Sequence, residues 1–111
     1  MNLLNETIKV LQREGLTLDD ALWFGCRSFE IEKEDFIKLA DKNYDSGYGA
    51  QQVATDLIIV GDSWWLERGE YDGSEWWEFR RKPVQPKFQK LVTTLITKNV
   101  GWESLAEMNE V

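Results

Sequence analysis

The sequence predicts a single α+β domain over residues 1–111, in which a three-stranded antiparallel meander at about 56–81 packs against several short helices. Three observations lead to this prediction. The chain has 111 residues, the length of one domain. Apolar residues recur at helical spacing in several segments. Two hairpin-turn signals lie close together within residues 56–81.

Amphipathic helices are predicted at residues 2–14, 32–42 and 87–97, where apolar side chains recur on one helical face. Gly15 follows the first of these segments and is a natural C-terminal cap. All three helices are expected to cover one face of the meander. Their apolar positions are Leu4, Ile8 and Leu11; Phe36, Leu39 and Ala40; and Phe88, Leu91, Val92, Leu95 and Ile96.

The segments between these helices carry weaker patterns. Residues 17–24 resemble a helix N-cap followed by acidic first-turn residues, which predicts a brief helix or turn. Residues 28–31 alternate as in a strand. Residues 43–49 are rich in glycine, asparagine and aspartate and predict a loop, and residues 50–54 predict a short helical piece.

The meander is predicted from two turns. Residues 57–60 are apolar and β-branched, and Gly61-Asp62 suits a two-residue turn before a strand that starts at Ser63. Asp72-Gly73 is the strongest short hairpin signal, because both residues tolerate positive φ. The sequence therefore predicts three consecutive antiparallel strands.

The positions of the turns predict the pairing of the strands. The turn at 72–73 pairs Tyr71 with Ser74 and, further along, Arg68 with Trp77. The turn at 61–62 pairs Ile59 with Trp64. Because side chains alternate between the faces of a sheet, both turns place one set of residues on the core face. This set is Leu57, Ile59, Trp64, Leu66, Trp77 and Phe79.

The opposite face of the predicted meander mixes aromatic and charged residues: Ile58, Val60, Trp65, Glu67, Trp76, Glu78 and Arg80. A large apolar side chain left in water forgoes roughly 1.5 to 3 kcal/mol of burial, so exposed tryptophans need a reason. Either the terminal segment, with Trp102, Leu105 and Met108, folds over this face, or a partner covers it.

Composition excludes several classes of enzyme. The chain contains no histidine, so a Ser-His or Cys-His nucleophile pair and an HExxH zinc site cannot form within it. The single cysteine, Cys26, lies in an apolar run and is expected to be a buried, inert thiol. No cofactor is predicted. No apolar run approaches the length of a membrane span, and the start of the sequence has no cationic segment, so a place in the cytosol is expected, away from the membrane.

The charge is divided unevenly along the chain. The formal net charge is −7, but residues 1–79 hold 17 acids and 7 bases, a balance of −10, whereas residues 80–98 hold six bases and no acid. An acidic surface is repelled by phosphate backbones, so direct binding of nucleic acid is not expected. The same acidity allows an alternative, in which the protein mimics nucleic acid and occupies the groove of another protein.

Carboxylates allow a further alternative. Glu67 and Glu78 are predicted cross-strand partners, an arrangement that could share a proton or hold a divalent cation. Arg68 and Arg80 lie close enough in the sequence to neutralise them, and charged cross-strand residues usually serve solubility.

One segment begins like a calcium-binding loop. Asp41, Asn43 and Asp45 have the required spacing, but the glycine of such a loop is expected at Ser46 and its bidentate carboxylate at Gln52. A solvated loop is therefore expected here, and no metal site is predicted.

A resemblance supplies context. The residues that carry it are Tyr44-Asp45-Ser46-Gly47-Tyr48-Gly49, residues 56–60, Leu66-Glu67-Arg68 and residues 71–79, of which 71–78 read Tyr-Asp-Gly-Ser-Glu-Trp-Trp-Glu. Over about residues 20–82, the chain resembles a group of small uncharacterised proteins encoded by phages and prophages of low-GC Gram-positive bacteria. The resemblance implies no catalytic residues. It implies a small acidic protein that binds and modulates a host or phage protein.

The leading hypothesis is therefore a non-enzymatic protein-interaction module of phage type. Its binding residues are predicted to be Trp65, Trp76, Tyr71, Arg68 and Arg80, because tryptophan and arginine dominate the energetics of protein interfaces. The partner is expected to be another protein, from the host or the phage. The alternatives are an acidic mimic of nucleic acid that inhibits a host defence or replication protein, and a carboxylate enzyme that uses a divalent metal.

Overall fold

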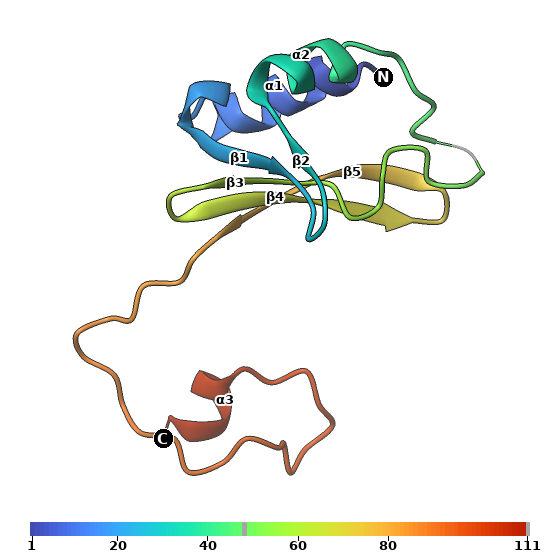
Figure 1. The fold of residues 1–111 in the computed structure, drawn as a ribbon. Coiled ribbons are helices and arrows are strands. Elements are labelled where there is room, and N and C mark those ends of the chain that lie inside the picture. Colours follow the sequence, from blue (N-terminus) through green and yellow to red (C-terminus); the bar gives the residue numbers. More distant parts are fainter. Residues whose placement is uncertain (48, 111) are drawn as a thin grey trace.

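The computed structural model describes residues 1–47 and 49–110 and shows an α+β fold built on a five-stranded antiparallel sheet (Figure 1). The order of the strands in the sheet is β2-β1-β3-β4-β5. Tyr48, in the predicted loop, lies outside the described residues. The helices are α1 (Leu3–Arg13), α2 (Lys33–Ala40) and α3 (Leu105–Asn109), and the strands are β1 (Ala21–Gly25), β2 (Glu30–Ile31), β3 (Ile58–Gly61), β4 (Trp64–Tyr71) and β5 (Ser74–Arg81).

The first two helices confirm the predictions for residues 2–14 and 32–42. Helix α1 begins after Asn2, whose side chain accepts a hydrogen bond from the backbone N–H of Asn5 at 2.9 Å. The chain leaves α1 through Gly15, which has a φ of +73°. Helix α2 carries Glu34 and Asp35 in its first turn, where negative charge is favourable.

The predicted meander is confirmed as β3, β4 and β5. Asp72 and Gly73 have φ values of 51° and 84°, so both central residues of the second turn are left-handed, as a type I′ hairpin requires. The register is the predicted one, with Tyr71 opposite Ser74 and Arg68 opposite Trp77.

The prediction for the first turn is wrong by one position. Strand β3 continues through Gly61, and Ile59 pairs with Leu66 instead of Trp64. The indole of Trp64 explains why Gly61 is needed in the strand, since a Cβ at position 61 would lie 2.1 Å from its Cε2 atom. The pairing shifts by two residues, so each side chain keeps its predicted face.

The helix or turn predicted at residues 17–24 is confirmed by the 3-10 helix η1 (Leu18–Asp20), but the prediction is wrong for residues 21–24, which form strand β1. The strand pairs with β3, but the register shifts between Ala21 and Trp23, which marks a β-bulge at Leu22. The bulge breaks the alternation by which a strand is recognised in a sequence. Strand β2 agrees with the strand-like pattern of residues 28–31 and forms the far edge of the sheet.

The core lies between the sheet and the two longer helices. Figure 1 shows α1 and α2 on the same side of the sheet, and we call the side that they cover the covered face. Phe24 of β1 and Phe36 of α2 stack with their ring centroids 4.7 Å apart. The predicted core-face residues all lie here, buried or packed against the core. The buried apolar residues are Val10, Leu11, Phe24, Phe36, Ala40, Ile59, Trp64, Leu66 and Trp77.

Residues 83–110, which we call the C-terminal arm, leave β5 and lie apart from the sheet on the side opposite α1 and α2 (Figure 1). The predicted helix at residues 87–97 does not form in the arm. The short helical piece predicted at residues 50–54, before β3, does not form either. An isolated helix of this length is marginal in water, and the arm has nothing to pack against. It contains only α3, which begins with a capping box between Ser104 and Glu107.

Candidate protein-interaction site

The face of the sheet opposite the helices, which we call the open face, carries a central row of residues from four strands. The pairings of β1 with β3, β3 with β4, and β4 with β5 align Trp23, Val60, Trp65 and Arg80 across the sheet. Three of these four side chains are large and apolar. Their row runs through the middle of the sheet, where a docked surface would exclude most water.

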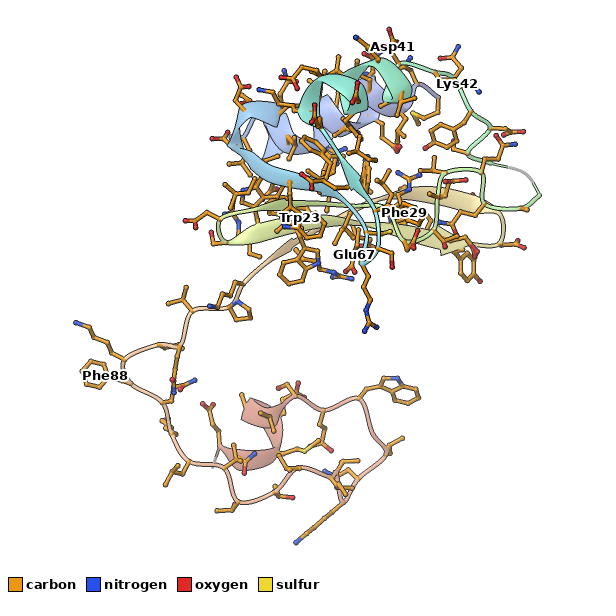
Figure 2. The ribbon with its side chains drawn as sticks, in the orientation of Figure 1. Trp23, Phe29, Asp41, Lys42, Glu67 and Phe88 are labelled. Carbon is orange, nitrogen blue, oxygen red and sulfur yellow. The ribbon has the colours of Figure 1, made fainter. Side chains whose placement is uncertain are left out.

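Charged and aromatic residues surround this row. Ile58 adds to its apolar area, and Glu67 and Glu78 stand opposite each other on β4 and β5. Figure 2 shows Glu67 on the side of the sheet away from α1 and α2. Tyr71 lies at the end of β4 beside the hairpin turn and is 77% exposed. The open face thus combines an apolar centre with a charged rim.

The tryptophans of the open face remain accessible to water. Trp23 and Trp76 are 38% and 37% exposed, and Trp65 is half-buried. Tryptophans usually become buried when something is available to cover them, because each large apolar side chain gains roughly 1.5 to 3 kcal/mol on full burial. The C-terminal arm does not supply this cover, since Trp102 is 95% exposed. The open face is therefore an apolar surface that remains accessible to water.

The orientation of Trp76 is fixed by its neighbours. Its indole lies over Gly69, the residue opposite it on β4, and a Cβ at position 69 would lie 2.7 Å from the indole Nε1. The same nitrogen donates a hydrogen bond to Glu78 Oε1 at 2.9 Å. A tryptophan held in one orientation loses little conformational entropy when a partner binds it.

Arg80 holds both carboxylates of the predicted pair. Its Nε donates to Glu67 Oε1 at 2.9 Å, and its Nη2 lies 3.8 Å from Glu78 Oε2. The hydrogen bond to Glu67 raises the pKa of the Arg80 guanidinium. The three side chains form an exposed charge cluster that can pair with either charge on a partner.

Four of the five predicted binding residues lie together on the open face: Trp65, Trp76, Tyr71 and Arg80. The fifth, Arg68, is corrected by the structure. It lies on the covered face, and its side chain is 0% exposed. The reason is the alternation of β4, which places Arg68 opposite the buried Trp77. Arg68 is therefore no part of the candidate interface.

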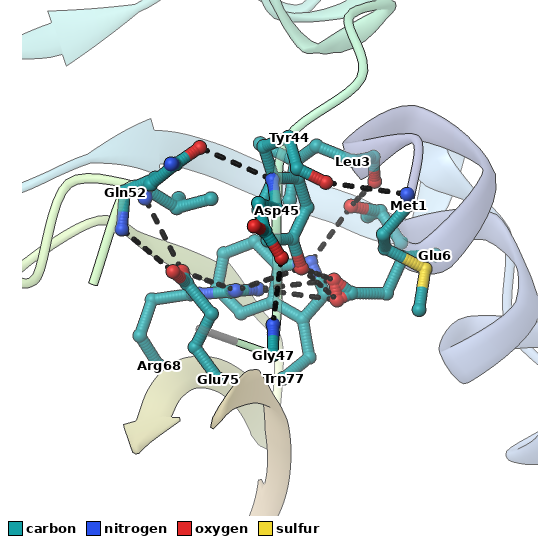
Figure 3. A network of polar contacts seen from close by, with 12 residues as sticks. Met1, Leu3, Glu6, Tyr44, Asp45, Gly47, Gln52, Arg68, Glu75 and Trp77 are labelled. Atoms are coloured by element: carbon teal, nitrogen blue, oxygen red, sulfur yellow. Dashed lines mark hydrogen bonds and ion pairs between the residues drawn. The ribbon is translucent and has the colours of Figure 1, made fainter. Parts of the chain in front are cut away.

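Arg68 is the centre of a buried polar network, shown in Figure 3. Its Nη1 lies 3.3 Å from Glu6 Oε1, and its Nη2 donates to Glu75 Oε1 at 2.9 Å and to Tyr44 Oη at 3.1 Å. The guanidinium also lies over the ring of Trp77, with 4.7 Å between Cζ and the ring centroid. Two carboxylates and one tyrosine thus compensate for burying one positive charge.

The network fastens the loop after α2 to the sheet. Glu75 accepts hydrogen bonds from the backbone N–H groups of Gln52 at 2.6 Å and Val53 at 3.2 Å. Tyr44 donates to Glu6 at 2.6 Å. Burial, and then the hydrogen bond to Glu6, raise the pKa of Tyr44 to about 12. Glu6, Tyr44 and Glu75 are thus engaged within the fold, and the buried Arg68 Nε is left without a hydrogen-bond partner among the described residues.

Two features of the sites were missed in the sequence. Trp23 belongs to the central row of the open face, but the bulge at Leu22 conceals its strand. The buried network could have been predicted from the sequence, because the predicted register already placed Arg68 opposite Trp77 on the core face. A charged residue at a core position requires buried partners of opposite charge.

The loop with calcium-like spacing uses its side chains for local contacts. Asp41 Oδ1 accepts from Asn2 Nδ2 at 3.0 Å, and Asp45 Oδ1 accepts from the backbone N–H of Gly47 at 3.1 Å. Within residues 1–47 and 49–110, no cluster of three or more acidic or cysteine side chains is placed to hold a metal ion. Cys26 is half-buried, so it is more accessible than predicted.

Comparison with protein-family models, with curated proteins and with solved structures finds no match for this chain. Among the described residues, no helix is long and apolar enough to cross a membrane.

Proposed function

We propose that this chain is a non-enzymatic protein-interaction module and that the open face is its binding surface. The observation that supports this proposal is the central row of Trp23, Val60 and Trp65, which crosses three paired strands without a covering element. Interfaces between proteins have an apolar, aromatic-rich centre and a polar rim, which is the composition of this face.

The residues expected to contribute most to binding are tryptophans. Tryptophan and arginine are enriched among the residues whose truncation weakens interfaces by 2 kcal/mol or more. Trp65 sits in the apolar row, and Trp76 is held in place by Gly69 and Glu78. Arg80 joins the row to the charged rim. The partner should therefore present apolar groups to the row and charged groups to the cluster around Arg80.

The expected partner is a protein of a bacterial host or of a phage, the context that the sequence resemblance implies. The acidity of residues 1–79, with 17 acids and 7 bases, supports the alternative of nucleic-acid mimicry. The two alternatives differ in their response to salt. Binding through the tryptophan row should persist at high ionic strength, whereas binding through distributed charge should weaken steeply.

The experiment is an affinity capture with the tagged full chain from lysate of a Gram-positive host, with nuclease added and at low and high salt. The test variant carries Trp65→Ala and Trp76→Ala. The matched control carries Leu39→Ala, which removes another exposed apolar side chain, on α2 and away from the open face. Circular dichroism must show that all three proteins are folded.

A protein that is retained by the wild type and the control but lost by the double variant supports the proposal. A protein that is retained equally by all three shows that the open face is not the binding surface. Retention that disappears at high salt and is unaffected by the double variant supports the acidic mimic instead.

A further inference from the structure

The C-terminal arm is a second exposed apolar surface. Phe88 and Leu91 are 92% and 96% exposed, and Figure 2 shows Phe88 directed away from the rest of the molecule. Within residues 83–110, every hydrogen bond and ion pair of the arm joins two residues of the arm itself. A segment of this size cannot bury its own apolar side chains, because too little chain is available to form a core.

The arm and the open face are complementary. The apolar residues of the arm are concentrated between Phe88 and Ile96, and all of them are exposed: Phe88, Leu91, Val92, Leu95 and Ile96. Residues 82–98 carry four lysines and no acid, whereas residues 1–81 hold 17 acids and 9 bases. These charges favour an approach of residues 82–98 to the body, whereas residues 83–110 as a whole hold three lysines and three acids and have no net charge. The carboxylates of Glu67 and Glu78 lie beside the apolar row.

We infer that the arm of one molecule docks on the open face of a second copy of this chain, and that the two copies exchange their arms symmetrically. This inference rests on the proposed function, because it uses the open face as a binding surface and names its occupant. A twofold dimer contains two equal contacts of this kind, so it covers both open faces and both arms.

The connector between β5 and the arm favours a second copy over the same chain. Pro83 and Pro86 fix their own φ angles and keep the preceding residues extended. Five residues in this conformation, 82–86, span about 15 Å. The connector starts two residues after Arg80, which is paired with Trp65 on the open face, and yet it carries the arm away from its own sheet. The arm lies off its own open face in the structure, and docking on a second copy needs no reversal of the connector (Figure 1).

Sedimentation equilibrium of the full chain tests the inference. The wild type is expected to show twice the mass of one chain at high concentration and to dissociate on dilution. The arm variant carries Leu91→Asp and Leu95→Asp, and the face variant carries Trp65→Lys. Each is expected to weaken the dimer at least tenfold. Leu39→Asp, on α2, is the matched control and should leave the dimer unchanged.

Mixing the variants gives the sharpest result. Arm and face variants, each monomeric alone, should form a heterodimer when mixed, because one intact arm can dock on one intact face. If Trp65→Lys does not fold, Glu67→Lys with Glu78→Lys keeps the tryptophans and reverses the charge of the face. That variant should also dissociate, and Lys87→Glu with Lys90→Glu in the other copy should restore the pairing.

Three outcomes would overturn the inference. The wild type stays monomeric up to about 1 mM; or a dimer survives in the arm variant; or a monomer forms in which the arm protects Trp65 of its own chain from a soluble quencher. The proposed function is judged separately. The arm variant has a free open face, so capture of a foreign protein that depends on Trp65 and Trp76 supports that function even where no dimer forms.

Discussion

The two faces of this sheet are built from the same parts and differ in what they do. The adjacent pairs Trp64-Trp65 and Trp76-Trp77 contribute one tryptophan each to each face, and the open face has Trp23 in addition. Each also has an arginine between two carboxylates and a tryptophan lying over a glycine. On the covered face these side chains are buried under α1 and α2, whereas on the open face they are accessible to solvent.

The difference shows that covering by helices, and not composition, separates the face that stabilises the fold from the face that we propose binds a partner. Trp64 and Trp77 are 4% and 5% exposed, whereas Trp76 is 37% exposed. The same residue types should therefore contribute to the free energy of unfolding on one side and to association on the other. Matched substitutions on the two faces test this directly.

Trp77→Ala and Trp76→Ala form the first matched pair. Trp77 donates from Nε1 to Thr7 Oγ1 at 2.8 Å and lies under the Arg68 guanidinium. Its truncation leaves a cavity and removes this donor, so that the Thr7 hydroxyl keeps only its own hydrogen bond to Leu3 O. We expect Trp77→Ala to lower the free energy of unfolding by roughly 3–5 kcal/mol. Trp76→Ala should lower it by about 1 kcal/mol, because its side chain is already partly in water. Urea denaturation measures both, and equal losses would show that the open face is also part of the core.

Arg68→Leu and Arg80→Leu form the second pair. Removing Arg68 leaves Glu6 and Glu75 buried without their counter-charge, which should destabilise the fold by roughly 3–5 kcal/mol. Removing Arg80 should leave the stability nearly unchanged, because Glu67 and Glu78 remain hydrated. Thermal and urea unfolding provide the measurement. A large loss for Arg80→Leu would contradict the assignment of its cluster to the rim of a binding surface.

Much of this two-faced sheet was predictable from the sequence. The Asp72-Gly73 turn alone specified the pairing of β4 with β5 and therefore the face of each tryptophan. The first turn was misplaced by one position, but an even shift of register preserves the faces. Helices α1 and α2 were predicted from the spacing of their apolar residues. The prediction held because these residues have a core to pack against.

The remaining features depend on contacts that no local pattern encodes. The bulge at Leu22 removes the alternation of β1, so Trp23 was not recognised as a member of the open face. Arg68 was assigned to the interface because arginine is common there, although its register placed it in the core. Residues 87–97 have a helical pattern but form no helix, since periodicity shows which side chains could be buried together and not whether a surface exists to bury them.

Gly61→Ala and Gly69→Ala form the third pair. A Cβ at position 61 would lie 2.1 Å from Trp64, whose ring is confined by the core, so we expect a loss of roughly 1–3 kcal/mol. A Cβ at position 69 would lie 2.7 Å from Trp76 Nε1, but this indole can move into solvent, so the loss should stay below about 1 kcal/mol. Chemical denaturation measures the free energy of unfolding of both variants and shows whether the two losses differ. Gly69→Ala should nevertheless weaken partner capture, because it displaces Trp76; unchanged capture would show that the orientation of Trp76 is unimportant.

The last effect is confined to the covered face and depends on pH. The pKa of Tyr44 is raised to about 12, above the value of about 10 expected in the unfolded chain, so the folded state holds this proton more tightly. The resulting stabilisation is fully present below pH 10 and is lost as the pH rises toward 12. Tyr44→Phe should remove this part of the pH dependence, and Tyr71→Phe, which changes an exposed tyrosine on the open face, should retain it. Urea midpoints measured between pH 9 and pH 12 for the three proteins test the assignment, and identical curves would show that Tyr44 is not held in the buried network.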